Sequence, residues 1–343
     1  MSPESDVPKI SAVIAARNEE GYIARCVQSV LEADYPADRL EVVVVDGMSE
    51  DRTAEIVREL TALDSRVRLV SNPRRITPVA FNLGIQSSTG DIVCIVAGHC
   101  TLDKDYFKLT VETLREHPEV WCAGGRETTV SDSYAGKAIA AAMTTRVGAG
   151  NASYRLGNQD GYVDTLMGSY WRWVFDKIGP FDEELVRNQD DELNFRVIKG
   201  GGKIWLNSSI KLVYYTRSSF RRLARQYNQY GFWRMRTIQK HRQPATLRQI
   251  APLVFVCLWL VLIAAWAAWR PMGYALLGFA GLYALGLVAG TIEVVRRFGW
   301  KLALPAPAVF LVLHFCYGFG SLRGLWAFYV RRKGRIADQP LSR

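Results

Sequence analysis

The amino-acid sequence predicts an α/β protein with a doubly wound, mostly parallel sheet, followed by transmembrane helices in its C-terminal part. Short β-branched apolar runs alternate with helical patterns up to about residue 215, and long uncharged apolar runs follow from residue 250. At 343 residues the chain has room for about two domains of ordinary size. We therefore divide it into a 1–215 α/β domain, a 216–249 basic amphipathic segment, a 250–330 transmembrane region and a 331–343 basic tail.

Four runs in the first domain are short, apolar and rich in β-branched residues, which is typical of parallel strands buried on both faces. They are residues 10–15, 41–45, 67–71 and 91–96. Helical patterns at about 19–33, 51–63 and 77–88 lie between them. This alternation predicts a doubly wound sheet, and ligands bind such sheets at the carboxyl ends of the strands.

Polar turns follow three of the predicted strands. Their sequences are AARNEE (15–20), DGMSEDRT (46–53) and AGHC (97–100). Neither the G-x-G-x-x-G pattern of dinucleotide-binding enzymes nor a P-loop is present in these turns. A turn ending in an acid suits uracil and ribose better, because the Asp46 carboxylate can accept from a base N–H and Glu19 from a ribose hydroxyl. The alternative for Asp46 is that it caps the following helix, as we also expect of Asp51.

Three apolar runs follow the first domain, at 250–269, 273–292 and 302–322. About 20 apolar residues cross a bilayer core, so we expect about three transmembrane helices. The basic residues around the first two runs predict that the α/β domain is cytoplasmic, at the inner (plasma) membrane. Three full crossings would then place Arg331 and the basic tail outside, against the charge rule. The third run is either a span whose basic tail is tolerated outside, or a re-entrant segment kinked at Pro305 and Pro307 or in the GFG of residues 318–320. Of these, we expect the three spans.

The net charge of +10 raises the question of nucleic-acid binding. Nine basic residues lie just before the first apolar run, interleaved with aromatic residues: Arg217, Arg221, Arg222, Arg225, Arg234, Arg236, Lys240, Arg242 and Arg248. Anionic lipid headgroups attract a basic, aromatic stretch beside a span. Because no nucleic-acid-binding module accompanies these residues, we expect the lipid bilayer and no nucleic acid as a partner.

Two further segments combine acids, amides and aromatic side chains. They are NQDDELNFR (188–196) and RQYNQYGFW (225–233). A carboxylate at a helix start, here Asp190, can remove a proton from an acceptor hydroxyl. The alternative is that Asp190 is only a helix N-terminal acid stabilised by the helix dipole.

The succession AARNEE, VVVVDGMSEDRT, AFNLGI, GDIVCIVAGHC, NQDDELNFR and RQYNQYGFW resembles the family-2 inverting glycosyltransferases of the GT-A fold, and most of all the succinoglycan-type membrane glucosyltransferases. The resemblance runs from about residue 10 to about residue 235. It implies a UDP-sugar donor, a divalent metal (Mn²⁺ or Mg²⁺) and a lipid-linked acceptor.

Carried over residue by residue, the resemblance implies that Ala16, Arg17, Glu19, Asn82 and Gly98 line the nucleotide site and that Asp46 contacts uracil. Asp190 takes the place of the general base, with Glu192 as a supporting acid. Donor and acceptor binding is implied for Gln226, Gln229, Tyr230 and Trp233, with Arg155 reaching the diphosphate. Processive relatives carry Q-x-x-R-W where this chain has Gln229 and Tyr230 at the last two positions, which argues against processive synthesis.

A second departure lies at residues 97–99, where the family usually has D-x-D. This chain has Ala97, Gly98 and His99, so His99 is the candidate metal ligand, and imidazole suits Mn²⁺ better than Mg²⁺. Ala97 is either a natural loss or a residue substituted to trap an inactive complex. We expect transfer of a sugar, a hexose such as glucose, from a UDP-sugar to a polyprenyl-diphosphate-linked saccharide in exopolysaccharide assembly. The alternative is a non-catalytic scaffold that binds nucleotide-sugar.

Overall fold

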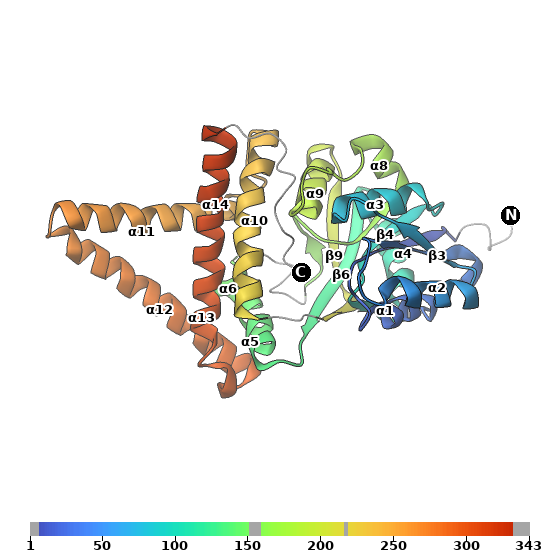
Figure 1. Ribbon diagram of the computed structural model, residues 1–343, viewed down its shortest axis with the longest axis horizontal. Helices are drawn as coiled ribbons and strands as arrows, with labels where there is room; N and C mark the ends of the chain where they lie inside the picture. Colours follow the sequence, from blue (N-terminus) through green and yellow to red (C-terminus); the bar gives the residue numbers. More distant parts are fainter. Residues whose placement is uncertain (1–6, 151–158, 216–218, 332–343) are drawn as a thin grey trace. The chain divides into compact units, whose positions relative to one another are not determined.

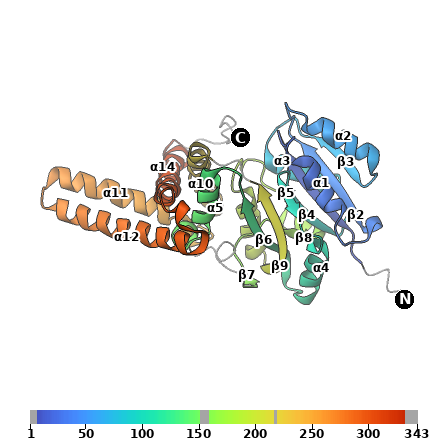
Figure 2. The same cartoon turned by 90° about the horizontal axis from the view of Figure 1, so that it is seen from below.

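The computed structural model describes residues 7–150, 159–215 and 219–331. Contacts divide the chain into two compact units (Figures 1 and 2). Residues 1–129 and 157–215 form the first, which we call the sheet unit, and residues 130–156 and 216–343 form the second, which we call the helical unit. Within the described residues, α5 (Tyr134–Met143) and α6 (Arg146–Ala149), which the sequence placed within the α/β domain, thus pack with helices that follow residue 216.

The first half of the sheet is parallel, as predicted. Its order is β3-β2-β1-β4, and the strands are β1 (Ile10–Ala16), β2 (Leu40–Asp46), β3 (Val67–Ser71) and β4 (Ile92–Ala97). Each begins and ends within one residue of the predicted run. Helices α1 (Ile23–Leu31), α2 (Thr53–Leu63) and α3 (Thr77–Gln86) connect them, so the βαβαβαβ order is confirmed.

The second half of the sheet is largely antiparallel. Its order continues from β4 as β8-β6-β9-β5, with β7 also paired to β9. The strands are β5 (Cys100–Leu102), β6 (Val120–Val130), β7 (Gly161–Tyr162), β8 (Ser169–Trp171) and β9 (Lys203–Tyr215). Helices α4 (Tyr106–Glu116), α8 (Arg172–Ile178) and α9 (Gln189–Lys199) belong to the same half. The acidic segment around Asp190 therefore begins a helix, as predicted.

Helices cover both faces of the parallel strands. Alternate residues of β1, such as Ile10, Ala12 and Ile14, pack with buried residues of α1, α2 and α4. On the other face, Val43 and Val45 of β2 pack with Ala80 of α3. Burial on both faces explains why these strands read as continuous apolar runs.

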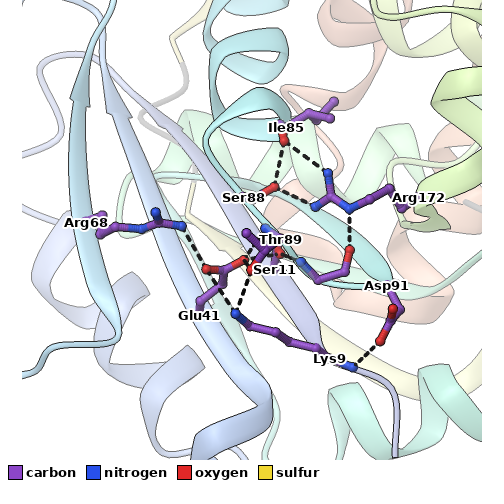
Figure 3. A network of polar contacts seen from close by, with 10 residues as sticks. Lys9, Ser11, Glu41, Arg68, Ile85, Ser88, Thr89, Asp91 and Arg172 are labelled. Atoms are coloured by element: carbon purple, nitrogen blue, oxygen red, sulfur yellow. Dashed lines mark hydrogen bonds and ion pairs between the residues drawn. The ribbon is translucent and has the colours of Figure 1, made fainter.

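A polar cluster closes the amino-terminal ends of the strands, opposite the ends where ligands bind (Figure 3). The Glu41 carboxylate accepts from the Ser11 hydroxyl and the Thr89 amide, both at 2.6 Å, and from Arg68 at 2.8 Å. Lys9 Nζ lies 3.5 Å from the same carboxylate. Burial raises the pKa of Glu41, but these hydrogen bonds and the two cations outweigh it and lower the pKa to about 2. The ionised Glu41 therefore ties β1, β2, β3 and the start of β4 together.

The helical unit contains α5 (Tyr134–Met143), α6 (Arg146–Ala149), α10 (Phe220–His241), α11 (Ala251–Ala268) and α12 (Met272–Phe298). Its last helix runs from Ala306 to Val330 as α13 (Ala306–Leu311), a π-helical turn (Val312–Cys316), α14 (Tyr317–Leu325) and a second π-helical turn (Trp326–Val330). We call this continuous element the third apolar helix. With α11 and α12, it is long and apolar enough to cross a membrane, which confirms the three apolar helices expected from the sequence.

Candidate active site

The carboxyl ends of β1, β2 and β4 bring the three polar turns to one edge of the sheet. Ala16 of β1 lies beside Asp46 of β2, and Ala15 lies beside Ala97 of β4. The Gly47 amide donates to the Ala16 carbonyl at 2.8 Å, and the Gly98 amide donates to the Ala15 carbonyl at 3.2 Å. The loops after β2 and β4 therefore leave the sheet on either side of β1.

The loops after β1 and β2 are interlocked by hydrogen bonds. The Asn18 amide donates to Ser49 Oγ, and the Glu50 amide donates to Asn18 Oδ1, both at 2.9 Å. The Glu19 amide donates to Thr53 Oγ1 at 2.7 Å. Asn18 has a φ of 56°, in the left-handed region that asparagine tolerates better than most residues. These contacts fix the backbone on both sides of Glu19.

Asp51 lies two residues before α2 and, as expected from the sequence, hydrogen-bonds to the start of that helix. Its Oδ1 accepts from the Thr53 amide at 2.9 Å. Burial raises the pKa of Asp51, but hydrogen bonds from Thr53 and Glu20 lower it by more. Asp46 has a different role, because its Oδ2 accepts from the Ser49 amide at 3.1 Å and so closes its own turn instead of capping α2. An ionised carboxylate has about four acceptor sites, so Asp46 retains capacity for a ligand N–H.

Glu19 and His99 form a buried pair between the loops after β1 and β4. His99 Nδ1 lies 3.1 Å from Glu19 Oε1, and both residues are at most 5% exposed. The ring of His99 meets the ring of Tyr214 edge-on at 4.5 Å, and its carbonyl accepts from the Tyr215 amide at 3.0 Å. A carboxylate that accepts from Nδ1–H selects the tautomer in which Nε2 carries the lone pair.

His99 Nε2 is the atom through which this site can hold a divalent cation. A carboxylate behind the other ring nitrogen is the usual support of a metal-binding histidine. Within residues 7–150, 159–215 and 219–331, no three His, Cys, Asp or Glu side chains are grouped to hold a metal. The residues therefore fit a cation that takes one ligand from His99 and the others from diphosphate oxygens and water. Ala97 offers no donor.

The loop glycines lie close to β1. A Cβ added to Gly98 would lie 3.2 Å from the Ala16 side chain and 3.3 Å from that of Glu19, and one added to Gly47 would lie 3.2 Å from the Arg17 Cβ. Side chains at these positions would press on Ala16, Arg17 and Glu19. The two glycines therefore keep the predicted nucleotide-lining residues close to the sheet edge.

The three acids at the start of α9 have different surroundings. Asp191 accepts from the Thr165 hydroxyl. Glu192 is buried, and its two carboxylate oxygens each accept from Arg196 at 2.8 Å. Arg196 in turn donates to the carbonyls of Gly179 and Pro180, at 3.1 and 2.8 Å. Glu192 therefore holds the loop before α9 through Arg196. The supporting catalytic role that the resemblance implies for Glu192 stays a prediction beside this positioning contact.

Asp190 remains the candidate base. It is the second residue of α9 and is half-buried, at a helix terminus that favours negative charge. Burial, together with the nearby charge of Asp190 among other groups, raises the pKa of the Tyr170 hydroxyl. That hydroxyl donates to Asn194 Oδ1 at 2.8 Å, so α9 is anchored to β8 next to Asp190.

Asn82 of α3 also holds the loop that leads to α9. Its Nδ2 donates to the Phe181 carbonyl at 2.9 Å and to Glu183 Oε1 at 3.1 Å, and its Oδ1 accepts from the Phe181 amide at 2.9 Å. Both N–H groups of the amide are thus engaged within the protein. Asn82 therefore positions the 181–183 loop, and its place at the nucleotide site, which the resemblance implies, stays a prediction.

The residues expected to bind donor and acceptor belong to α10 of the helical unit. Gln226 Nε2 donates to the Tyr230 hydroxyl at 2.7 Å, and Gln229 is buried. Trp233 is 0% exposed and packs on Phe232 and Phe328. A fully buried indole has no surface left for a substrate, so Trp233 is a core residue, contrary to expectation. Arg155 lies outside the described residues.

Two features of the site could not be predicted from the sequence. The Glu19–His99 pair joins residues 80 positions apart, and no spacing rule connects them. Tyr215, at the end of β9, stacks on Tyr22 at 5.6 Å and lies 5.3 Å from the Arg25 guanidinium. Tyr215 was not a predicted site residue, because its position depends on the antiparallel half of the sheet.

Known proteins resemble the chain over most of its length. The family model "Glycosyl transferase family 2" matches residues 11–166. The succinoglycan biosynthesis protein ExoA of Rhizobium meliloti is 31% identical over 311 residues, which cover 84% of this chain and 92% of that protein. A dolichyl N-acetyl-α-D-glucosaminyl phosphate 3-β-D-2,3-diacetamido-2,3-dideoxy-β-D-glucuronosyltransferase of Methanococcus voltae is 26% identical, over 92% of this chain and 97% of that protein.

Solved structures share the fold. The mannosyltransferase PcManGT of Pyrobaculum calidifontis, solved with GDP-Man and Mn²⁺, superposes with a TM-score of 0.58 at 20% identity and covers 94% of this chain and 88% of that one. A Staphylococcus aureus TarS structure comprising its residues 1–349 superposes with a TM-score of 0.50 at 16% identity, covering 95% and 92%. The mixed sheet, the site at its carboxyl edge and the similarity to these known proteins together identify the family of this chain. The chain is a glycosyltransferase of the GT-A fold and belongs to glycosyl transferase family 2.

Proposed function

We propose that this protein transfers a hexose such as glucose from a UDP-sugar to a saccharide carried on a polyprenyl diphosphate. The observation that carries the proposal is the meeting of Glu19, Asp46 and His99 at the sheet edge, in a unit that also presents Asp190 at the start of α9. Relatives named for dolichyl-phosphate-linked sugar transfer and for succinoglycan biosynthesis support a lipid-linked acceptor.

The proposed reaction is a single displacement with inversion. Asp190 takes the proton of an acceptor hydroxyl as its oxygen attacks the anomeric carbon, and the bond to the UDP oxygen breaks. Asp46 accepts from the uracil N–H, and Glu19 holds the His99 imidazole. Ala16, Arg17 and Gly98 shape the edge against which the nucleotide lies. Holding donor and acceptor in register contributes to the rate by lowering the entropy cost of the encounter.

A divalent ion bound through His99 would neutralise the diphosphate of the leaving group. The Mn²⁺ in the PcManGT structure supports a cation in this fold. The protein supplies one orientable imidazole, so the ion depends on the nucleotide for most of its ligands. Softer imidazole ligation favours Mn²⁺ over Mg²⁺.

The apolar helices support an acceptor at the bilayer surface. A saccharide on a polyprenyl diphosphate presents its hydroxyl at headgroup level, and the basic helix α10 precedes the first apolar helix along the chain. Cytoplasmic orientation of the sheet unit, at the inner membrane, belongs to the same proposal. The loops on one side of the first two apolar helices carry many basic residues, whereas the loop on the other side carries only Arg270. Gln226, Gln229 and Tyr230 stay candidates for acceptor and donor contacts.

Asp46→Ala tests the nucleotide contact. We expect it to weaken UDP binding by about 1.5 to 3 kcal/mol, the range for hydrogen bonds to a charged group. Isothermal titration calorimetry with UDP and the purified full-length protein measures this. Asp51→Ala is the matched control, because Asp51 lies in the same loop but hydrogen-bonds to the start of α2, and it should lower stability with little change in UDP affinity. Unchanged UDP affinity in Asp46→Ala would remove Asp46 from the site.

The Glu19–His99 pair provides a separate test of the cation. His99→Ala should abolish the difference between UDP affinities measured with and without Mn²⁺. Glu19→Gln should weaken Mn²⁺-dependent binding by about 10-fold or more, as is usual when the carboxylate behind a metal-binding histidine is lost. His117→Ala is the control, because His117 stacks on Trp205 and has no role in the predicted site. If His99→Ala keeps the full Mn²⁺ dependence, the ion is held elsewhere.

A further inference from the structure

The three apolar helices differ in what surrounds them. In their most apolar 18-residue windows, 6% of the residues of α11 and of α12 are buried inside the protein, against 39% for the third apolar helix. Leu258, Val261, Leu277 and Leu285 are among the large apolar side chains that α11 and α12 expose. Hydrocarbon is therefore the expected surrounding of α11 and α12, whereas a much larger share of the third apolar helix is packed against protein.

The third apolar helix packs most extensively against α10, and the two run side by side (Figures 1 and 2). It also contacts α5, α11 and α12. Glycines allow close approach: a Cβ on Gly320 would lie 2.1 Å from the Asn228 carbonyl oxygen, and one on Gly231 would lie 2.0 Å from the Tyr317 carbonyl oxygen. Further along, Gln239 Nε2 donates to the Phe328 carbonyl at 2.7 Å. The two helices therefore lie at the same level from about residue 228 to residue 239 of α10.

α10 is too basic for the hydrocarbon core. It carries six Arg and Lys residues and no Asp or Glu: Arg221, Arg222, Arg225, Arg234, Arg236 and Lys240. Charged side chains at the bilayer centre are costly and require partners in the protein. Because α14 lies at the level of α10, it lies outside the hydrocarbon as well. Its own Arg323 donates to Asn228 of α10, which adds a polar contact along this pair of helices.

α11 and α12 lead away from the α10–α14 pair and meet at a short turn (Figure 1). Trp266, Trp269 and Tyr274 are exposed around this turn, and Arg270 lies over the Trp266 ring at 5.5 Å. Phe298 and Trp300 are exposed at the other end of α12, next to Arg296 and Arg297. Aromatic and basic residues at both ends of an apolar stretch are typical of the two membrane interfaces. The 18 residues of α11 span about 27 Å, close to the ~30 Å of a bilayer core.

We propose that α11 and α12 alone cross the bilayer, as a helical hairpin, and that the third apolar helix lies with α10 among the headgroups on the side from which the hairpin enters. The bilayer partner is one with anionic headgroups, which the arginines of α10 attract. This arrangement places Arg296, Arg297, Lys301 and Arg331 on one side and Arg270 on the other. It therefore satisfies the charge rule that three crossings violate. The proposal does not depend on the sugar-transfer reaction.

Cysteine accessibility in sealed, right-side-out vesicles tests the proposal with the full-length protein. Cys257 and Cys316, the two cysteines that are not buried, are first replaced by alanine. Arg270→Cys, Lys301→Cys and Arg331→Cys are then labelled with a membrane-impermeant maleimide, before and after permeabilisation. We expect Lys301→Cys and Arg331→Cys to show the same labelling pattern, either before permeabilisation or only after it. Arg270→Cys should show the other pattern, whichever side the sheet unit occupies.

Two results would overturn the arrangement. If Arg331→Cys reacts together with Arg270→Cys, the third apolar helix crosses the bilayer. If all three cysteines react in one condition, no crossing occurs and the hairpin lies on the surface. Tyr329→Cys, whose side chain is exposed near the same end, serves as a second reporter if Arg331→Cys accumulates poorly. Because labelling needs no substrate, a failure of the proposed reaction would leave this result unchanged.

Discussion

Asp190→Asn is expected to lower turnover by about two to four orders of magnitude, the range found when a general base is removed. The substitution keeps the size of the side chain at the start of α9 but takes away the carboxylate that accepts the proton of the acceptor hydroxyl. UDP affinity should stay nearly the same, because nucleotide contacts are assigned to the ends of β1, β2 and β4. Turnover is measured as UDP release with a lipid-linked acceptor, and affinity by calorimetry.

Asp191→Asn is the matched control for this prediction. The neighbouring acid accepts from the Thr165 hydroxyl, and an amide oxygen can still accept that bond. Its effect on turnover should therefore be small beside that of Asp190→Asn. Equal turnover in Asp190→Asn and the unsubstituted protein would show that α9 does not supply the base.

Glu41→Gln is expected to destabilise the protein by about 3 to 4 kcal/mol at neutral pH. The folded-state pKa of about 2 lies below the ordinary value of 4.5, and each pKa unit corresponds to about 1.4 kcal/mol. Glutamine keeps an acceptor for Ser11 and Thr89 but loses the attraction to Lys9 and Arg68. Chemical denaturation of the detergent-solubilised protein measures the free energy of unfolding.

The pH dependence distinguishes this role from a packing effect. Because the folded-state pKa is depressed, the contribution of Glu41 is fully present above pH 4.5 and is lost as pH falls toward 2. The difference between Glu41→Gln and the unsubstituted protein should therefore shrink over that interval. Glu59→Gln, at an exposed position of α2, should leave the free energy of unfolding unchanged. A pH-independent difference for Glu41→Gln would contradict the ionic account.

The parallel half of the fold followed from the sequence because its strands are buried on both faces. Residues 42–45, for example, are continuously apolar and are not typical of a surface segment, so the sequence predicts the position of this strand within one residue. The sequence does not predict the strands of the antiparallel half. β7 and β8 have two and three residues, too few for any periodicity to appear, whereas β6 and β9 are long strands that mix apolar with polar or charged residues.

The candidate site, like the fold, could be predicted only in part. That polar turns follow the strands could be predicted, because carboxyl ends of parallel strands share one edge of the sheet. The sequence could not predict which acid at the start of α9 is hydrogen-bonded within the protein. Glu192 pairs with Arg196, and Arg196 donates to carbonyls of a loop that precedes α9. The loop contacts of Asn82 and the complete burial of Trp233 could not be predicted for a similar reason. Their residue types suit ligand binding, but Asn82 hydrogen-bonds to the 181–183 loop and Trp233 packs on Phe328 of the third apolar helix.

The central claim is that the sheet unit transfers a sugar to a lipid-linked acceptor, and mass spectrometry of that acceptor tests it most directly. The purified full-length protein is incubated with a panel of UDP-hexoses, Mn²⁺ and polyprenyl-diphosphate-linked saccharides, in parallel with Asp190→Asn. We predict that one donor adds a single hexose to the lipid-linked saccharide, and that Asp190→Asn binds UDP normally but forms almost no product. UDP binding with no mass increase for any donor, or equal product from Asp190→Asn, would contradict the account.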